Sequence, residues 1–187
     1  PYSAMILADL GATVIKIENP GDPDYTRNFP PFTKTDKESA FFAQYNRNKL
    51  GMTLNLKTAE GKKTLKQLVK KADIVAENFR PGTLAAFKLD YDSIKDLNKK
   101  LVYVSISGYG QNGPMRGKAA FAPTVHAECG TAFAKFKHEN IKLTDIESMQ
   151  SDFSHADVYT GLEATISCLA ALNNAQKTGI GQHIDIS

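Results

Sequence analysis

Cysteine, net charge and long apolar runs are all scarce in this sequence of 187 residues. The two cysteines, Cys129 and Cys168, are too few for a disulfide scaffold and lack metal-type spacing, which fits a reducing compartment. We expect both to be small core residues. The 23 Lys and Arg residues against 20 Asp and Glu residues leave a net charge of +3, which gives no reason to expect a nucleic-acid partner.

No run approaches the roughly 20 consecutive apolar residues that a membrane-spanning helix needs. The first residues also lack the basic and then apolar segments of a secretory signal. We therefore expect a cytoplasmic protein without a membrane partner. With 42% hydrophobic residues, and with neither an internal repeat nor a low-complexity linker, the chain is expected to form one globular α/β domain with its own core.

Strands and helices alternate along the sequence, as a parallel sheet requires. The pattern predicts a doubly wound parallel α/β sheet of the Rossmann-like kind. Strands are expected at residues 12–18, 52–56, 73–79, 101–107 and 182–187. Helices are expected at residues 1–10, at 38–46, after Thr58, as two short helices ending near Asn98, and at 154–175.

Both ends of the sequence interrupt a pattern. Residues 1–10 read as a helix with no start signal, and residues 182–187 alternate like a strand and then stop. We therefore expect this chain to be part of a longer protein, with a domain that is incomplete at both ends.

A glycine-rich stretch at residues 108–113 spells GxGxxG directly after a predicted strand. A dinucleotide fingerprint needs its glycines to open a helix, whereas here residues 114–117 continue as loop. We predict a loop that lets the backbone approach a ligand, and no nicotinamide cofactor.

Metal and serine chemistry have little support in the sequence. The histidines share no helical or hairpin spacing with acidic residues that would make a metal site, so each is expected at the surface or in packing; they are His126, His138, His155 and His183. No serine lies in a GxSxG elbow, which argues against a Ser-His-Asp hydrolase.

Carboxylate chemistry remains, and two aspartates are candidates. Asp157 is expected in the first turn of the long helix, where the helix dipole and free amides favour an ionised carboxylate that can act as a nucleophile. First-turn acidic residues also occur purely for helix stability. Asp152 is an equal candidate on chemistry alone.

Five separated motifs, in order, resemble the class III coenzyme A transferases, the superfamily of formyl-CoA transferase, carnitine CoA-transferase and α-methylacyl-CoA racemase. They are LADLGATVIKIE at residues 7–18, NRNK at 46–49, ADIVAENFRPG at 72–82, SISGYGQNGP at 105–114 and TGIGQHID at 178–185. The resemblance covers nearly the whole chain. It implies a Rossmann-like CoA-binding large domain, here the amino-terminal part.

Members of this family are about twice as long as this chain. The resemblance implies a further strand and loop before residue 1, and a small second domain after residue 187 that this chain lacks. It also implies a homodimer of two interlocked subunits for the full-length protein.

The family's nucleophilic aspartate opens an Asp-x-x-x-Gly segment before the Thr-Gly-x-Gly-Gln motif. That segment is DVYTG at residues 157–161, so the resemblance favours Asp157 over Asp152. It implies that the Asp157 carboxylate attacks an acyl-CoA thioester to give a mixed anhydride. CoA then attacks the anhydride to form an aspartyl-CoA thioester, from which a second, small carboxylic acid collects CoA. Neither a metal nor a redox cofactor is implied.

The family's CoA contacts lie in loops that follow strands. Carried over by motif, they fall on Asn55, Leu56, Lys57, Thr58, Asn78, Phe79, Arg80 and the segment that ends at Phe121. Lys57 and Arg80 are expected to meet phosphate, or else to be ordinary surface charges, and Phe79 is expected to lie against adenine.

Three departures from the family pattern bear on function. Asn19 follows Glu18 where a basic residue often holds the nucleotide, and Ala122 replaces a frequent aspartate after Phe121. Racemases of the superfamily use a histidine where Phe121 stands, which weakens an α-methylacyl-CoA racemase assignment. A CoA-binding protein without turnover is the remaining alternative.

Overall fold

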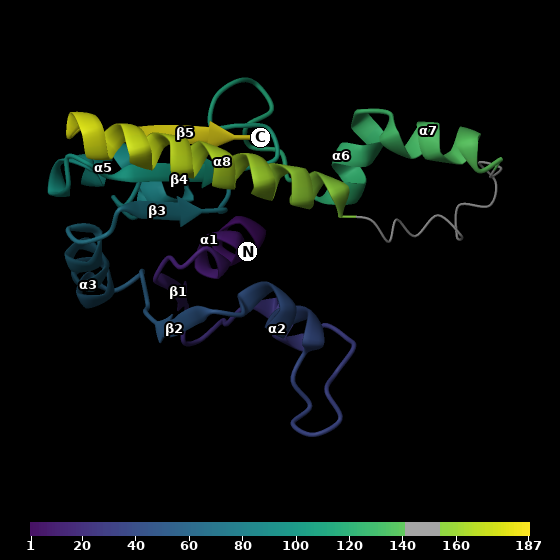
Figure 1. Ribbon diagram of the computed structural model, residues 1–187, viewed down its shortest axis with the longest axis horizontal. Helices are drawn as coiled ribbons and strands as arrows, with labels where there is room; N and C mark the ends of the chain where they lie inside the picture. Colours follow the sequence, from purple (N-terminus) through teal and green to yellow (C-terminus); the bar gives the residue numbers. More distant parts are fainter. Residues whose placement is uncertain (141–153) are drawn as a thin grey trace.

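The computed structural model describes residues 1–140 and 154–187 as an α/β fold with parallel strands (Figure 1). The strands are β1 (Val14–Glu18), β2 (Lys49–Thr53), β3 (Ile74–Glu77), β4 (Val102–Ile106) and β5 (Gln182–Ile186). The α-helices are α1 (Tyr2–Asp9), α2 (Ala40–Asn46), α3 (Ala59–Val69), α4 (Thr83–Ala86), α5 (Tyr91–Ile94), α6 (Ala122–Glu128), α7 (Thr131–His138) and α8 (His155–Thr178). Two 3-10 helices are η1 (Tyr25–Asn28) and η2 (Lys95–Leu97).

Helices cover both faces of the three-stranded sheet β3-β4-β5, which confirms the predicted doubly wound parallel class. Successive residues of β4 point to opposite faces, as strand geometry requires. Val102 and Val104 pack into a core that α1 and α8 share, whereas Leu101, just before β4, and Tyr103 pack into a core formed with α3, α4 and α5. Burial on both faces explains why the strand reads as a continuous apolar run.

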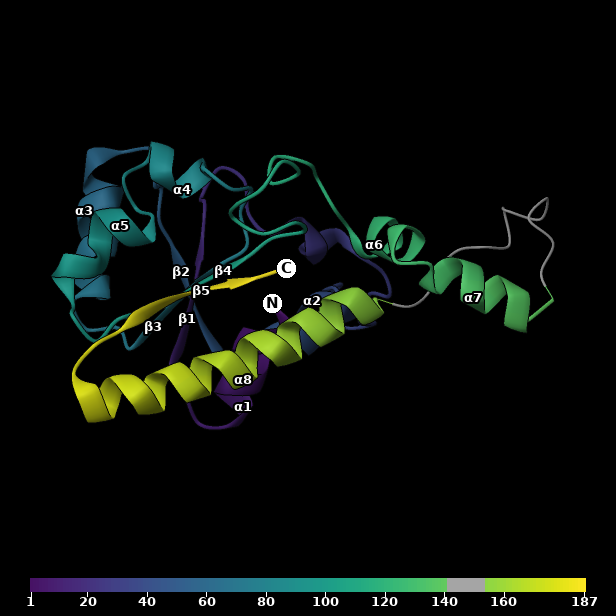
Figure 2. The ribbon, with the colours of Figure 1, turned by 90° about the horizontal axis from the view of Figure 1, so that it is seen from above.

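Small residues on α8 let this helix lie close to the sheet. Ala164, Cys168, Ala171 and Ala175 recur at helical spacing, and all four are buried against β4 and β5. Figure 2 shows α8 running the length of the sheet, with α1 beside it. The prediction of a buried Cys168 is confirmed, and burial raises the pKa of its thiol to about 11.

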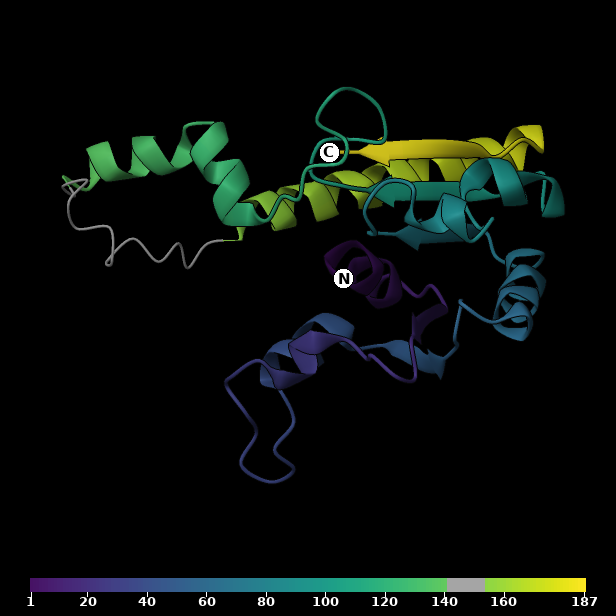
Figure 3. The ribbon, with the colours of Figure 1, turned by 180° about the vertical axis from the view of Figure 1, so that it is seen from behind.

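The second strand pair, β1-β2, is also parallel, but it forms a hydrogen-bonded group separate from β3-β4-β5. Among the described strands, β1 pairs only with β2, and β3 pairs only with β4. Figures 1 and 3 show the pair on the far side of α1 from the larger sheet. The expected single sheet is therefore present as two parallel pieces.

A strand was predicted at residues 52–56, but β2 ends at Thr53. The prediction therefore placed the strand three residues late, since β2 begins at Lys49. Instead, Asn55 turns the chain, because its side-chain oxygen accepts the Lys57 N–H at 3.0 Å. Leu56 packs against the core on the α3 side of the sheet. This apolar residue is therefore part of the packing around the helix and not part of a strand.

Two further differences lie around α6 and α7, helices that the sequence analysis did not assign. Cys129, expected in the core, is exposed where α6 ends. Its thiol pKa lies below the ordinary value because of the hydrogen bond with the Thr131 hydroxyl. The segment is short and mixed in polarity, so it shows little of the periodicity that predicts helices.

The motif at residues 178–185 joins α8 to β5 through two glycines with different roles. Gly179 ends α8 in the left-handed conformation, with φ +78°, as a helix cap often requires. Gly181 lies directly on the Leu101 backbone, so that any side chain there would overlap it. The Gly181 N–H also donates to the Lys99 carbonyl at 2.7 Å. Within the described residues, no helix is long and apolar enough to cross a membrane.

Candidate functional site

The strands β3, β4 and β5 all point toward the end of the molecule at which α8 begins (Figures 1 and 3). In α/β sheets, ligands bind at the carboxyl ends of the strands. The loops after these strands and the first turn of α8 therefore make up the region in which a binding site is expected.

The loop after β3 carries three of the predicted CoA contacts. Asn78 is tied down, since its side-chain amide donates to the Ile106 carbonyl at 2.7 Å and so joins the ends of β3 and β4. The Phe79 N–H donates to the Glu77 carboxylate at 2.8 Å. The Phe79 ring is 49% exposed, and Arg80 is exposed as well. Two side chains of this loop are thus available to a ligand on an anchored backbone.

The loop between β2 and α3 carries the other predicted set. The Thr58 hydroxyl donates to the Asn55 carbonyl at 2.8 Å and accepts the Gly61 N–H at 3.0 Å, so it caps α3. Leu56 is partly buried in the core, whereas Lys57 is exposed. Lys57 is the charged residue of this set, and its side chain is exposed at the surface.

The glycine-rich stretch is a loop, as predicted, and it is anchored at two points. Gly108 lies so close to Ala120 that a side chain would overlap the Ala120 methyl group. Gly110 adopts φ +78° beside Asp185, and the Gln111 N–H donates to the Asp185 carboxylate at 2.8 Å. The glycines therefore allow close packing within the protein.

Phe121 is the residue immediately before α6, and its ring is 69% exposed. Further along α6, His126 is buried with 7% exposure. The His126 Nε2 accepts the backbone N–H of Ala156 at 3.1 Å, which joins α6 to the first turn of α8. Figure 2 shows α6 at this end of α8.

Asp157 lies in the first turn of α8, where it was predicted, and it is exposed. Asp152, the rival candidate, lies outside the described residues. The geometry thus gives Asp157 the accessibility that a carboxylate nucleophile needs.

Gly161, one turn after Asp157, lies against α1. A side-chain carbon on Gly161 would come within 2.8 Å of the Tyr2 ring and 3.4 Å of the Ser3 amide. Tyr2 of α1 therefore occupies the space beside Gly161. The first turns of α8 are therefore held by α1 on one side and by α6 on another.

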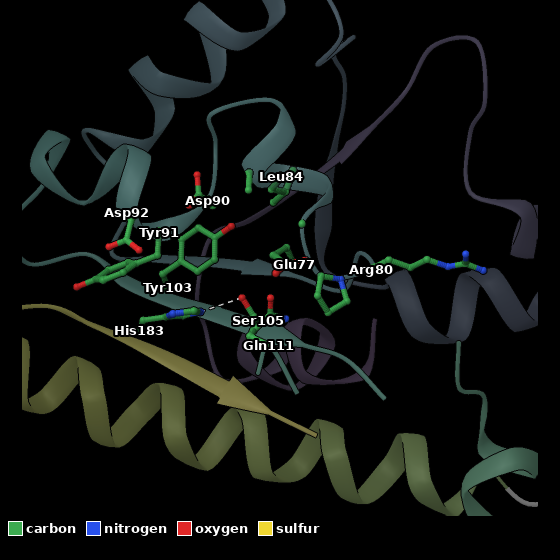
Figure 4. Close-up of a pocket in the computed structure, with 13 residues that line it drawn as sticks. Glu77, Arg80, Leu84, Asp90, Tyr91, Asp92, Tyr103, Ser105, Gln111 and His183 are labelled. Atoms are coloured by element: carbon green, nitrogen blue, oxygen red, sulfur yellow. Dashed lines mark hydrogen bonds between the residues drawn. The ribbon is translucent and has the colours of Figure 1, made fainter. Parts of the chain in front are cut away.

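A small cavity of about 130 Å³ lies beside Arg80, between the sheet and the helices α4 and α5 (Figure 4). Its floor contains Ser105 and His183, whose Oγ and Nε2 atoms are 2.9 Å apart. The His183 ring stacks on Tyr91 at 5.2 Å between ring centres and meets Tyr103 edge-on at 5.3 Å. His183 is therefore a packing residue, as predicted.

Glu77 lies opposite Ser105 in the sheet, so that Glu77, Ser105 and His183 form a row of polar side chains. Burial raises the pKa of Glu77 above its ordinary value, against the opposing contacts of the Ser105 hydroxyl and the Phe79 amide. The serine lies between the carboxyl group and the histidine, whereas in a hydrolase triad the histidine is in the middle. Figure 4 also shows the Arg80 side chain extending away from the cavity. Among the described residues, no group of acidic, His and Cys side chains could hold a metal.

Comparison with known proteins identifies the chain. The family model described as CoA-transferase family III matches residues 1–187. The chain belongs to CoA-transferase family III. The motif resemblance is thereby confirmed.

Named relatives of this family III chain include transferases of small acids. It is 38% identical to the succinate–glutarate CoA-transferase of Agrobacterium fabrum, over 100% of the chain and 46% of that protein. It is 36% identical to the human succinyl-CoA:glutarate CoA-transferase, over 99% of the chain and 41% of that protein. The chain thus spans less than half the length of these relatives.

Solved structures of similar proteins agree with the fold. A CaiB/BaiF family protein from Brucella suis is 35% identical, with a TM-score of 0.86 over 100% of this chain and 48% of that one. A hypothetical protein from Mycobacterium tuberculosis is 28% identical, with a TM-score of 0.84 over 100% of this chain and 49% of that one.

Sequence reasoning on this family III chain missed two features of the region. His126 was assigned to the surface or to packing, and its hydrogen bond to the first turn of α8 was not foreseen. The row of Glu77, Ser105 and His183 was also missed. Strand alternation could have placed each of the three on one face of its own strand, but only the register of β3, β4 and β5 brings them together.

Proposed function

We propose that the full-length protein is a CoA transferase that moves CoA from an acyl-CoA thioester to a small carboxylic acid, with Asp157 as the nucleophile. The observation that carries this proposal is an exposed Asp157 in the first turn of α8, in a chain of CoA-transferase family III. The relatives' names include succinate, glutarate and oxalate, which are all small diacids. A small diacid is therefore the acceptor to test first.

In the proposed mechanism, a carboxylate oxygen of Asp157 attacks the thioester carbonyl and expels CoA as thiolate. The product is a mixed anhydride between Asp157 and the donor acid. The CoA thiolate then attacks the Asp157 carbonyl, which releases the donor carboxylate and leaves an aspartyl-CoA thioester. The acceptor carboxylate attacks that thioester, which expels CoA as thiolate and leaves a second mixed anhydride between Asp157 and the acceptor. The thiolate finally attacks the acceptor's carbonyl, which gives the new acyl-CoA and frees the Asp157 carboxylate. Each step conserves charge without an added oxidant or metal.

CoA itself would lie across the loops that follow β2, β3 and β4. Lys57 and Arg80 are exposed and can reach phosphate groups, and the half-exposed Phe79 ring can lie against adenine. Asn55, Thr58 and Asn78 would act mainly through the backbone they hold in place, since their side chains already bond within the protein. Phe121 offers an exposed side chain directly before α6, the helix whose His126 contacts the first turn of α8.

We also propose that residues 1–187 are part of a large CoA-binding domain, and that the whole protein is an interlocked homodimer in the cytoplasm. The split sheet supports the domain proposal, because β1 and β3 each lack a partner on one edge among the described strands. We propose that the strand ahead of α1, which the family resemblance implies, joins the two parallel groups into one sheet.

The experiment that tests the nucleophile uses the full-length protein with succinyl-CoA as donor and glutarate as acceptor. Asp157→Asn removes the charge with little change in size, so transfer should fall by at least about a thousandfold, the range seen for loss of catalytic nucleophiles. CoA should still raise the melting temperature of the variant. Asp152→Asn is the matched control and should keep most activity.

Trapping shows which residue is acylated. Incubation with succinyl-CoA and a hydroxylamine quench should give a hydroxamate at Asp157 on peptide mass analysis. A hydroxamate on another residue, or near-normal transfer by Asp157→Asn, would show that Asp157 is not the nucleophile.

A further inference from the structure

The side chain of His126 reaches across from α6 to the backbone of α8. It is 7% exposed, and its Nε2 accepts the Ala156 N–H at 3.1 Å. A ring nitrogen that accepts a hydrogen bond carries no proton, so Nε2 is the unprotonated ring nitrogen in this contact.

This hydrogen bond gives a partner to one of the N–H groups at the start of α8. The first N–H groups of a helix have no partner within the helix, and a side chain at the N-cap position usually accepts one of them. Within the part of α8 that the structure describes, the Ser154 side chain makes no such hydrogen bond. His126 provides an acceptor for Ala156 instead, from a different helix.

Ala156 is the residue directly before Asp157. Holding the Ala156 N–H restrains the His155–Ala156 peptide, one residue before Asp157, and so restrains the start of the turn that carries the carboxylate. On the other side of the turn, Tyr2 packs on Gly161. Because a displacement of about 1 Å can lower a reaction rate by about a hundredfold, this restraint bears directly on the chemical step.

We propose that His126 is a positioning residue that orients Asp157 by capping the first turn of α8. The proposal rests on the proposed function, since it takes Asp157 as the nucleophile. His126 acts through the Ala156 backbone and need not contact the substrate. Helix α6, which carries His126, begins directly after Phe121. It therefore connects the segment proposed to bind CoA with the turn that carries the nucleophile.

Two substitutions distinguish the effect of losing the hydrogen bond from the effect of losing the ring. His126→Phe keeps a ring of similar size but removes the acceptor. His126→Gln keeps an acceptor, because the glutamine amide oxygen can occupy the place of Nε2. His138→Phe, the same change at an exposed site on α7, is the matched control and should behave as the wild type.

The full-length enzyme is assayed with succinyl-CoA and glutarate. In His126→Phe we expect kcat to fall by about tenfold or more, with KM for succinyl-CoA changed by less than about twofold, because the loss affects alignment rather than binding. His126→Gln should recover most of kcat. A His126→Phe enzyme with unchanged kcat would overturn the proposal, and so would a His126→Gln enzyme as impaired as His126→Phe.

Hydrogen exchange of the same proteins gives a readout that does not depend on catalysis. Loss of a cap should speed amide exchange in the peptide that contains residues 155–158 by about fivefold in His126→Phe, and not in His126→Gln. If exchange and kcat respond as expected but the hydroxamate forms elsewhere, the nucleophile assignment fails while the capping role stands. If exchange is unchanged in His126→Phe, the capping role itself is refuted.

Discussion

At the scale of single residues, three glycines lie so close to another segment of the chain that a side chain would not fit. Gly181 lies on Leu101, Gly108 on Ala120 and Gly161 on Tyr2. Sequence motifs that contain these glycines could suggest ligand-binding loops, since glycine also lets a ligand approach the backbone. In this protein the three contacts are internal: those of Gly108 and Gly161 hold elements near the candidate site, and that of Gly181 holds the start of β5 against Leu101.

Gly181→Ala tests this interpretation. The added methyl group would overlap the Leu101 carbonyl and push β5 away from β4, so we expect a loss of about 3 kcal/mol or more in the free energy of unfolding. The measurement is urea denaturation followed by circular dichroism. Gly51→Ala is the control, because a side chain there meets nothing within 4 Å, and it should change stability by less than about 0.5 kcal/mol. Equal stability of both variants would show that Leu101 can move aside.

At the scale of elements, the start of α3 was easier to predict than the end of β2. Thr58 was recognised as the start of a helix, and its hydroxyl does cap α3 at Gly61. The capping signal is local, since the side chain and the amide it accepts are three residues apart. The end of β2 was placed three residues late, at Leu56, whose burial depends on the distant helices α4 and α5.

Removing the α3 cap should have a modest and specific effect. In Thr58→Ala the Gly61 N–H loses its partner, and the free energy of unfolding should fall by about 1 kcal/mol. Thr58→Ser keeps the hydroxyl and should recover most of that loss. Lys63→Ala, on the exposed face of the same helix, serves as the control in thermal and urea denaturation. A Thr58→Ala protein as stable as the wild type would mean that water replaces the cap without loss.

At the scale of the whole molecule, the arrangement favours a transferase over a racemase of the same superfamily. A racemase that works with two bases must remove a proton from one face of the α-carbon and deliver one to the other. Where the racemases have a histidine, this chain has Phe121, an exposed ring that cannot carry a proton. The exposed carboxylate of Asp157 has the chemistry of covalent transfer.

The full-length protein should therefore not exchange the α-proton of a branched acyl-CoA. Incubation of 2-methylacyl-CoA in heavy water, followed by mass spectrometry, should show no deuterium uptake above the rate without enzyme. Transfer of CoA from succinyl-CoA to glutarate is measured in parallel to prove that the preparation is active. Deuterium uptake at a rate similar to transfer would refute the transferase proposal.

The sequence alone determined the α/β parallel class, the place of most helices and strands, the family, and the candidacy of Asp157. These conclusions depend on local signals: apolar periodicity, capping residues and short motifs whose residues are near one another in the chain. Asp157 could be placed in a first helical turn because the residues that start a helix lie beside it.

The surroundings of Asp157, and the residues that meet across the sheet, depend on contacts between distant parts of the chain. His126 and Ala156 are 30 residues apart, and Ser105 and His183 are 78 residues apart. The register of β4 with β5 and the angle at which α6 meets α8 arise from the packing of many apolar side chains at once. No short stretch of sequence contains that information, because each contact depends on how all the packed elements fit together.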